Sequence, residues 1–236
     1  MDLKPLLCGE GVKRSELEEL AARRGFEAVG DVSKADAVVV FKPTRSQIDR
    51  LLATQPPYAL IEIPAPDRAF GKRMMRALAS KGLFVSLCTA SAFHADLTKL
   101  ICTALGVRIS LSEERRFDIE TAVEEALSNA MVHGNLDVAS SLRNDPADFD
   151  MYCDLVNQRL TTPLYAERRI EILATWSPEG LDIEVHDEGR GYEASNVNAP
   201  PQLEAKCGRG FILIRELTRN VTISEHGRSL TMSFAP

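Results

Sequence analysis

The stretch "EEALSNAMVHGN", residues 124–135, decides how the rest of the chain is interpreted. It ends a longer region, 112–135, in which apolar residues recur every three or four positions, and this periodicity predicts one long amphipathic helix. Glu125, Asn129 and His133 are spaced four apart, so they lie along one flank of that helix. Taken alone, such a polar flank is more often solvated than directed at a ligand.

Two glycine-containing stretches downstream supply further polar groups. In "HDEGRGY" (186–192), Asp187 ends a predicted strand, and Gly189 and Gly191 allow the backbone to turn sharply and approach a ligand closely. A carboxylate there can accept a hydrogen bond from an exocyclic amine such as that of adenine. In "GRGF" (208–211), glycines open a predicted helix, and the free N–H groups of a helix N-terminus favour an anion. Each motif alone is weak, because both also occur as plain turns.

The three motifs in this order are more specific. E-A-x-x-N-A on a helix, D-x-G-x-G after a strand and G-x-G at a helix start resemble the GHKL (Bergerat-fold) ATPase superfamily over roughly residues 83–236. The resemblance implies an α+β fold, a sandwich of a mixed sheet with helices on one face. Within the superfamily, the chain is most similar to the anti-sigma-factor serine/threonine kinases of bacterial partner switching. It lacks a phosphoacceptor hairpin before the Asn-bearing helix, and the loop between Gly191 and Gly208 is short.

The resemblance implies a role for each motif residue. Glu125 would act as general base, and Asn129 would coordinate Mg²⁺, which prefers oxygen ligands and bridges phosphate oxygens. Asp187 would accept a hydrogen bond from the adenine amine of ATP. The remaining adenine and phosphate contacts would come from Gly189, Gly191, Gly208, Arg209, Gly210 and Thr231. His133 is expected to act behind these residues or as a cation at the helix end, and Glu124 is expected to be solvated.

The implied activity is phosphoryl transfer from ATP to a serine or threonine of a partner protein. The expected substrate is a STAS-type antagonist. The kinase would also sequester a sigma factor or another regulator. The alternatives are a nucleotide-dependent binding module, a gyrase-type ATPase and a histidine-kinase-like ATPase domain, all without this phosphotransfer. Glu125 favours the kinase, because a protein that only binds nucleotide needs no base.

The first 82 residues form a separate α/β unit in this interpretation. Runs such as "ADAVVVF" (35–41) are typical of buried strands, and they alternate with helical stretches. The unit resembles a degenerate response-regulator receiver, since "AVVVF" is followed by Lys42 and Pro43 where a working receiver needs an aspartate. We expect a module for homodimerisation or partner docking. A helical insert is predicted at about 136–165, with a helix over 145–160 that starts at Asp145.

The overall charge excludes some classes of partner. The chain has 236 residues, a net charge of −6 and a pI of about 5.4, which argues against a sequence-independent nucleic-acid binder and against binding to an anionic membrane surface. Its five cysteines are scattered, without a CxxC pair, which indicates reduced thiols and no zinc site. No apolar run has the length of a membrane span, so a cytoplasmic location is expected.

Overall fold

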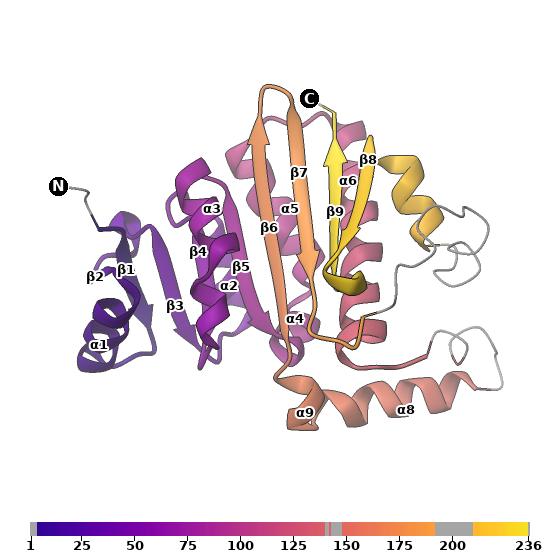
Figure 1. Cartoon of the computed structure of the whole chain (residues 1–236), viewed down its shortest axis with the longest axis horizontal. Coiled ribbons are helices and arrows are strands. Elements are labelled where there is room, and N and C mark those ends of the chain that lie inside the picture. The colour runs from indigo at the N-terminus through magenta and orange to yellow at the C-terminus, as the bar shows by residue number, and fades with distance from the viewer. Residues whose placement is uncertain (1–3, 140–141, 143–147, 192–209, 236) are drawn as a thin grey trace.

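One continuous sheet runs through the molecule. The computed structural model describes residues 4–139, 142, 148–191 and 210–235. The strands in this part of the chain are β1 (Leu6–Glu10), β2 (Glu27–Ala28), β3 (Ala37–Phe41), β4 (Ala59–Ile63), β5 (Leu83–Cys88), β6 (Arg169–Ser177), β7 (Gly180–His186), β8 (Asn220–Ser224) and β9 (Ser229–Phe234). They form a nine-stranded sheet in the order β2-β1-β3-β4-β5-β6-β7-β9-β8 (Figure 1).

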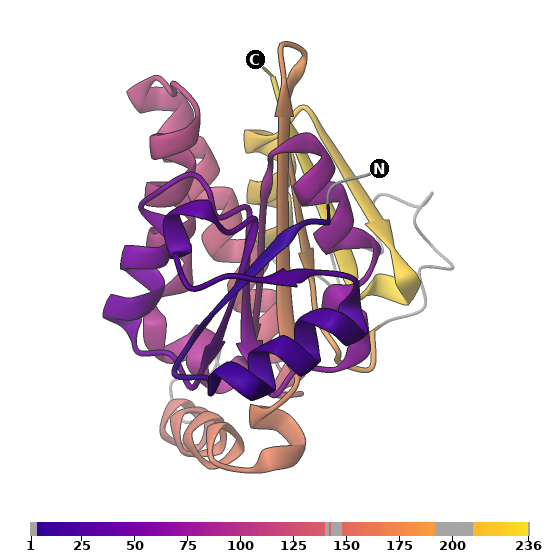
Figure 2. The same ribbon diagram turned by 90° about the vertical axis from the view of Figure 1, so that its left-hand side faces the viewer.

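The first half of this sheet is parallel. Strands β2, β1, β3, β4 and β5 pair in parallel, in the order of a doubly wound α/β sheet. Helices α1 (Arg14–Arg24) and α3 (Lys72–Ser80) cover one face, and α2 (Arg45–Leu52) covers the other (Figure 2). Because both faces are covered, the strands are almost continuously apolar and buried, as the "AVVVF" run indicates.

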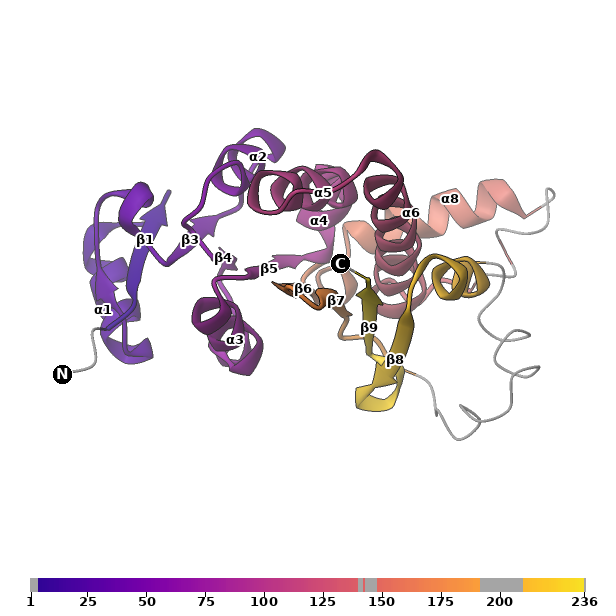
Figure 3. The same ribbon diagram turned by 90° about the horizontal axis from the view of Figure 1, so that it is seen from above.

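The second half is antiparallel, from β5 through β6, β7 and β9 to β8. Helices α4 (Thr89–Ala95), α5 (Leu97–Arg108), α6 (Glu113–Ser128) and a helix over 210–217 lie on one face of it (Figure 3). Between them, a single apolar core joins Ala122 and Ala126 of α6 to Ile183 of β7 and Met232 of β9. The predicted α+β fold, a mixed sheet with helices, is confirmed.

The hydrogen bonding does not stop between residues 82 and 83. Strand β5 pairs with β4 on one side and with β6 on the other, so it belongs to both halves of the sheet. The main core likewise contains Val38 and Leu60 from the first half and Ile172 from the second. The division into two domains at residue 82 stays a prediction about the sequence, and the strands on either side of it form one sheet.

The helices differ in detail from the periodicity. The stretch before the long helix contains two helices, α4 and α5, which are separated at Asp96 with a φ of 55°. The insert contains α8 (Phe149–Leu160) and the short α9 (Pro163–Ala166), which lie across one end of the sheet (Figure 1). The predicted N-cap, Asp145, lies outside the described residues. Short 3₁₀ turns are η1 (Val32–Lys34), η2 (Asp67–Phe70) and η4 (Glu225–Gly227).

Within the described ranges, none of the helices is both long enough and apolar enough to cross a bilayer.

Candidate functional site

The polar flank of the long helix lies where its geometry changes. The chain is α-helical through Ser128 and then forms a π-helix, η3, over Asn129–Asn135. Such π segments occur frequently at functional sites. Glu125 and Asn129 are half-buried, whereas the neighbouring Glu124 is exposed, as the sequence predicted.

Glu125 and Asn129 lie against the start of the helix over 210–217. A Cβ atom on Gly210 would be 2.1 Å from Glu125 Oε2 and 3.8 Å from Asn129 Nδ2. A side chain at position 210 would therefore displace the end of the Glu125 carboxylate. The structure therefore brings Gly210 together with Glu125 and Asn129, which lie more than 80 positions earlier in the sequence. The other two members of that motif, Gly208 and Arg209, lie outside the described residues.

The second motif contacts the same helix at its end. A Cβ on Gly189 would be 2.4 Å from the carbonyl oxygen of Gly134, and a Cβ on Gly134 would be 2.6 Å from Asp187 Oδ1. These distances are too short for any side chain, so two glycines are needed for the turn after β7 to pack on η3. Gly134 is a site residue that the sequence analysis missed, because a glycine there also fits a helix end.

Asp187 is a buried carboxylate with one unused oxygen. The side chain is 8% exposed, and Oδ1 accepts a hydrogen bond from Gly189 N at 2.8 Å. Among the described residues, Oδ2 has no hydrogen-bond partner. Burial raises the pKa of Asp187 to about 6, because removal from water disfavours the charged form. An amine that donates a hydrogen bond to Oδ2 would offset this cost, which is what the exocyclic amine of adenine can do.

Asn135 fixes the turn that carries Asp187. Its side chain is fully buried and makes three hydrogen bonds. Nδ2 donates to Thr89 Oγ1 at 2.8 Å and to the carbonyl oxygen of Arg169 at 2.9 Å. Oδ1 accepts from Glu188 N at 2.7 Å. Asn135 thus connects α4, β6 and the turn after β7, a role that local sequence pattern cannot reveal because its partners are distant in the sequence.

His133 connects the end of the long helix to the segment that follows it. Its Nδ1 lies 2.6 Å from the carbonyl oxygen of Val138, so the ring donates its Nδ1 proton to the segment that follows the helix. Gly191 has a φ of 66°, and a Cβ there would be 2.2 Å from the carbonyl oxygen of His226. Gly191 therefore packs against the turn between β8 and β9.

The structure does not place Thr231 with the other predicted site residues. It pairs with Glu184 of β7, and it alternates along β9 with Leu230 and Met232, which belong to the core on the α6 side. Successive residues of a strand point to opposite faces, so Thr231 points away from α6 and from the face on which Asp187 meets Gly134. Leu230 occupies the face toward the helices.

The residues present fit Mg²⁺ and ATP. The Asn129 side chain, whose Nδ2 is the atom near Gly210, also carries one oxygen, and Mg²⁺ typically combines one or two protein oxygens with phosphate oxygens and water. The N–H groups at the start of the 210–217 helix suit a phosphate. A separate cleft of about 340 Å³ lies at the opposite end of α6, lined in part by Ser112, Asp118 and Arg219, away from all these groups.

Comparison with known proteins agrees with this arrangement. The model of the family described as the histidine kinase-like ATPase domain matches residues 88–234, which is more than half of the chain. No curated protein matches the sequence significantly. The matched range runs from the end of β5 to the end of β9, so it includes all the site residues described above.

Proposed function

Because the chain belongs to the histidine kinase-like ATPase domain family, we propose that it is an ATP- and Mg²⁺-dependent serine/threonine protein kinase of the anti-sigma-factor type. The family assignment itself establishes an ATP-binding domain of the ATPase or kinase type. The proposal adds the acceptor, a serine or threonine of a STAS-type protein, and the sequestration of a sigma factor or another regulator. It also adds action in the cytoplasm.

The observation that carries the proposal is the position of Glu125. Its carboxylate lies directly against Gly210, the first described residue of the helix over 210–217, and the γ-phosphate of a bound ATP would lie close to this point. A base at that point can take the proton from an attacking hydroxyl. A protein that only binds nucleotide has no need of one.

The chemistry asked of the chain is modest. The acceptor hydroxyl attacks the γ-phosphorus, the bond to the β-phosphate oxygen breaks to leave ADP, and Glu125 receives the hydroxyl proton. Mg²⁺, when bound through Asn129, would neutralise charge on the phosphates. At the other end of the nucleotide, Asp187 Oδ2 accepts a hydrogen bond from the adenine amine. The glycines at 134 and 189 allow the turn after β7, which carries Asp187 and is called the adenine turn below, to pack close to η3.

We assign partner docking, or docking of a second copy of the chain, to the first half of the molecule. Its strand order matches a doubly wound sheet, which is the order expected of a degenerate receiver. Strand β3 ends at Phe41 and is followed by Lys42, so no carboxylate stands there to accept a phosphoryl group. We therefore propose that this half binds a partner protein or a second copy of the chain and is not itself phosphorylated.

The test uses a matched pair of glutamates. The full chain is incubated with γ-labelled Mg·ATP and the STAS-type proteins encoded near its gene. We expect label on a serine or threonine of one of them. Glu125→Gln should slow labelling by about 100-fold or more, the usual contribution of a general base, while ATP binding is retained. Glu124→Gln removes an exposed carboxylate one residue away and should leave the rate unchanged.

The other outcomes are equally informative. ATP binding without label on any STAS-type protein would reject the kinase and support a nucleotide-dependent binding module. Equal rates for Glu125→Gln and the wild type would remove Glu125 from the mechanism. Asn129→Ala should abolish the Mg²⁺ dependence of nucleotide binding, which calorimetry with and without Mg²⁺ measures.

A further inference from the structure

The turn that carries Asp187 is supported on two sides by the antiparallel half of the sheet. On one side lie Gly134 and Asn135 at the end of the long helix. On the other side is the turn between β8 and β9, where Arg228 accepts a hydrogen bond from Asp187 N at 2.9 Å through its carbonyl oxygen. Both supports belong to the segment that matches the ATPase family.

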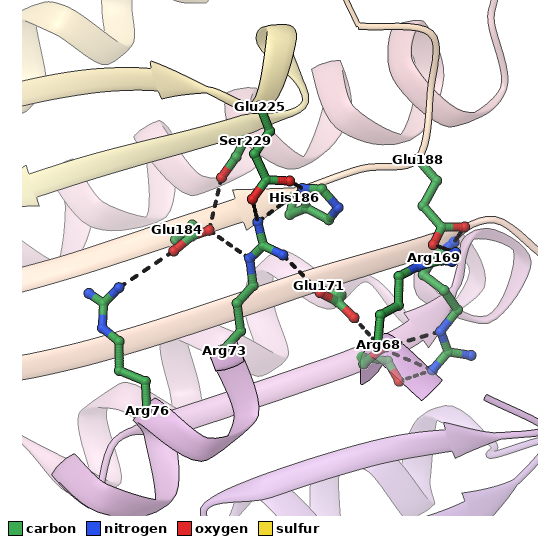
Figure 4. A network of polar contacts seen from close by, with 11 residues as sticks. Arg68, Arg73, Arg76, Arg169, Glu171, Glu184, His186, Glu188, Glu225 and Ser229 are labelled. Atoms are coloured by element: carbon green, nitrogen blue, oxygen red, sulfur yellow. Dashed lines mark hydrogen bonds and ion pairs between the residues drawn. The ribbon is translucent and has the colours of Figure 1, made fainter. Parts of the chain in front are cut away.

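A third support comes from the parallel half. Arg68 of η2 forms an ion pair with Glu188, the residue between Asp187 and Gly189. Figure 4 shows Arg68 beside Glu188 and Arg169, with Arg73 and Arg76 extending from α3 to carboxylates on the neighbouring strands. The arginines at 68 and 73 thus reach from a part of the chain before residue 82 to the strands and turns around the nucleotide site.

Glu188 depends on Arg68 for one of its two oxygens. Its Oε2 accepts a hydrogen bond from Arg169 N at 3.0 Å. Its Oε1 is buried and accepts no well-aligned hydrogen bond in the described structure, so the guanidinium of Arg68 is its compensating charge. A buried carboxylate oxygen that loses its partner is costly, and the side chain moves to find water. Because Glu188 is bonded through its backbone to Asp187 and Gly189, that movement reaches the adenine turn.

Arg73 of α3 contacts β7, just before Asp187, and also the turn between β8 and β9. Its Nε donates to Glu184 Oε1 at 2.6 Å, and its Nη2 pairs with Glu225, the first residue of the β8–β9 turn. The same Nη2 lies 3.3 Å from His186 Nδ1, one residue before Asp187. Burial and the nearby Arg73 lower the pKa of His186 to about 4, so at pH 7 the ring is neutral and can accept this hydrogen bond.

We propose that Arg68 and Arg73 are positioning residues of the nucleotide site, through which the parallel half of the molecule determines how well Asp187 recognises adenine. The inference rests on the ATP-binding part of the proposed function and not on phosphotransfer. Arg68 acts on the turn through Glu188, and Arg73 acts through His186 and the β8–β9 turn. Anything that shifts η2 and α3, such as a partner docked on the parallel half, changes ATP affinity by the same contacts.

Arg68→Gln is the direct test, since Arg68 is 58% exposed and its loss leaves the core intact. Arg50→Gln is a matched control: Arg50 lies in the parallel half, is 57% exposed, and pairs with Glu10, which is 18% exposed against 17% for Glu188. Neither Arg50 nor Glu10 contacts the turn. Calorimetry measures the Kd of the full-length protein for Mg·ATP and for Mg·inosine triphosphate, which carries an oxygen in place of the adenine amine.

The wild type should prefer ATP to inosine triphosphate, because only ATP carries an N–H donor at position 6 of the purine, where it can reach Asp187 Oδ2. In Arg68→Gln, the Kd for ATP should rise about fivefold or more, the size of a typical coupling between sites, while the Kd for inosine triphosphate changes little. Arg50→Gln should keep both values. Arg68→Lys should recover part of the preference, since lysine retains the charge. Glu188→Gln, which keeps an acceptor for Arg169 N, should reproduce the loss.

Three outcomes would overturn the inference. The first is an unchanged ratio of the two Kd values in Arg68→Gln, and the second is an equal loss of affinity for both nucleotides, which indicates a general structural defect. The third is a wild type without affinity for ATP, which would also end the proposed function. A wild type that binds ATP but phosphorylates no partner would reject the proposed kinase and leave this inference standing.

Discussion

The two halves of the sheet contrast in how they are covered. Strands β3 and β4 of the parallel half have helices on both faces, and their side chains are buried on both sides. Strands β7 and β9 of the antiparallel half alternate between buried and half-buried residues, with the core on the α6 side and polar groups on the other. The parallel half is buried on both faces, whereas in the antiparallel half α6 packs on the sheet through an apolar core and, at the end of this helix, through glycines and the Asp187 carboxylate.

This difference explains where a ligand can bind. In the parallel half, the space between sheet and helices is filled by apolar side chains. At the end of α6, Gly189 lies so close to Gly134 that a Cβ on Gly189 would collide with the Gly134 backbone, and the Glu125 carboxylate occupies the space beside Gly210. Glycine has no Cβ, so it allows the backbones of two segments to approach this closely.

The largest effect is expected from a methyl group at Gly189. Gly189→Ala would put Cβ within 2.7 Å of three backbone atoms of Gly134, which cannot move without displacing η3. We expect a loss of about 3 kcal/mol or more in the free energy of unfolding, at the high end of overpacking, together with loss of measurable ATP binding. Urea unfolding and calorimetry with Mg·ATP provide the two measurements.

The control for this substitution lies in the parallel half. A Cβ on Gly30 would meet no atom within 4 Å, so Gly30→Ala should stay within about 0.5 kcal/mol of the wild type and bind ATP normally. If Gly189→Ala were as harmless as Gly30→Ala, the close packing of the adenine turn on η3 would be wrong, and with it the basis of the comparison.

Most of the fold could be predicted from local pattern, but its continuity could not. The buried runs of β3 and β4 and the hairpin of β6 and β7 follow from hydrophobicity and turn residues. The pairing of β5 with both β4 and β6 is a contact between distant segments, and local periodicity carries no signal for it. The sequence pattern changes at residue 82 because the burial of the strands changes there, although the sheet continues.

The site was predictable to a similar extent. Motif spacing pointed to Glu125, Asn129 and Asp187, each of which lies near a glycine of a partner segment. Asn135 and Arg68 were missed, because a polar residue at a helix end and an arginine in a short turn are usually solvated. Their importance depends on distant partners, Thr89 for one and Glu188 for the other.

The two halves also hold buried carboxylates of opposite kinds. Asp187 has an unused oxygen, whereas Glu62 of β4 accepts hydrogen bonds from Cys88 N and Ser91 Oγ, both at 2.8 Å. The pKa of Asp187 rises from 3.8 to about 6 on folding. Protonation of Asp187 therefore contributes most to the stability of the folded state below pH 4. This contribution is lost as the pH rises through 6.

At pH 7, Asp187→Asn should consequently raise the free energy of unfolding of the nucleotide-free protein by about 1–3 kcal/mol, because it removes an uncompensated buried charge. The gain should disappear near pH 4, and ATP affinity should fall. Glu62→Gln should instead lower stability at pH 7 by about 1–3 kcal/mol, since it breaks a satisfied arrangement. Thermal unfolding from pH 4 to pH 7 measures the stability of both variants. If both substitutions changed the stability at pH 7 in the same direction, the proposed difference between the two carboxylates would be wrong.

The smallest effect is expected at Thr231. A substitution there tests whether only one face of the antiparallel half takes part in nucleotide binding. Its hydroxyl makes no hydrogen bond to a described residue, and its side chain lies on the face that carries Glu184. Thr231→Val keeps the shape and the β-branching, so stability should change by less than about 0.5 kcal/mol and the Kd for Mg·ATP should stay the same. A marked rise in this Kd would mean that the residue reaches the nucleotide after all. The register of β9 against β7 would then have to shift by one residue, which would also expose Met232 and Phe234. An unchanged Kd confines adenine recognition to the face toward α6, where Leu230 stands.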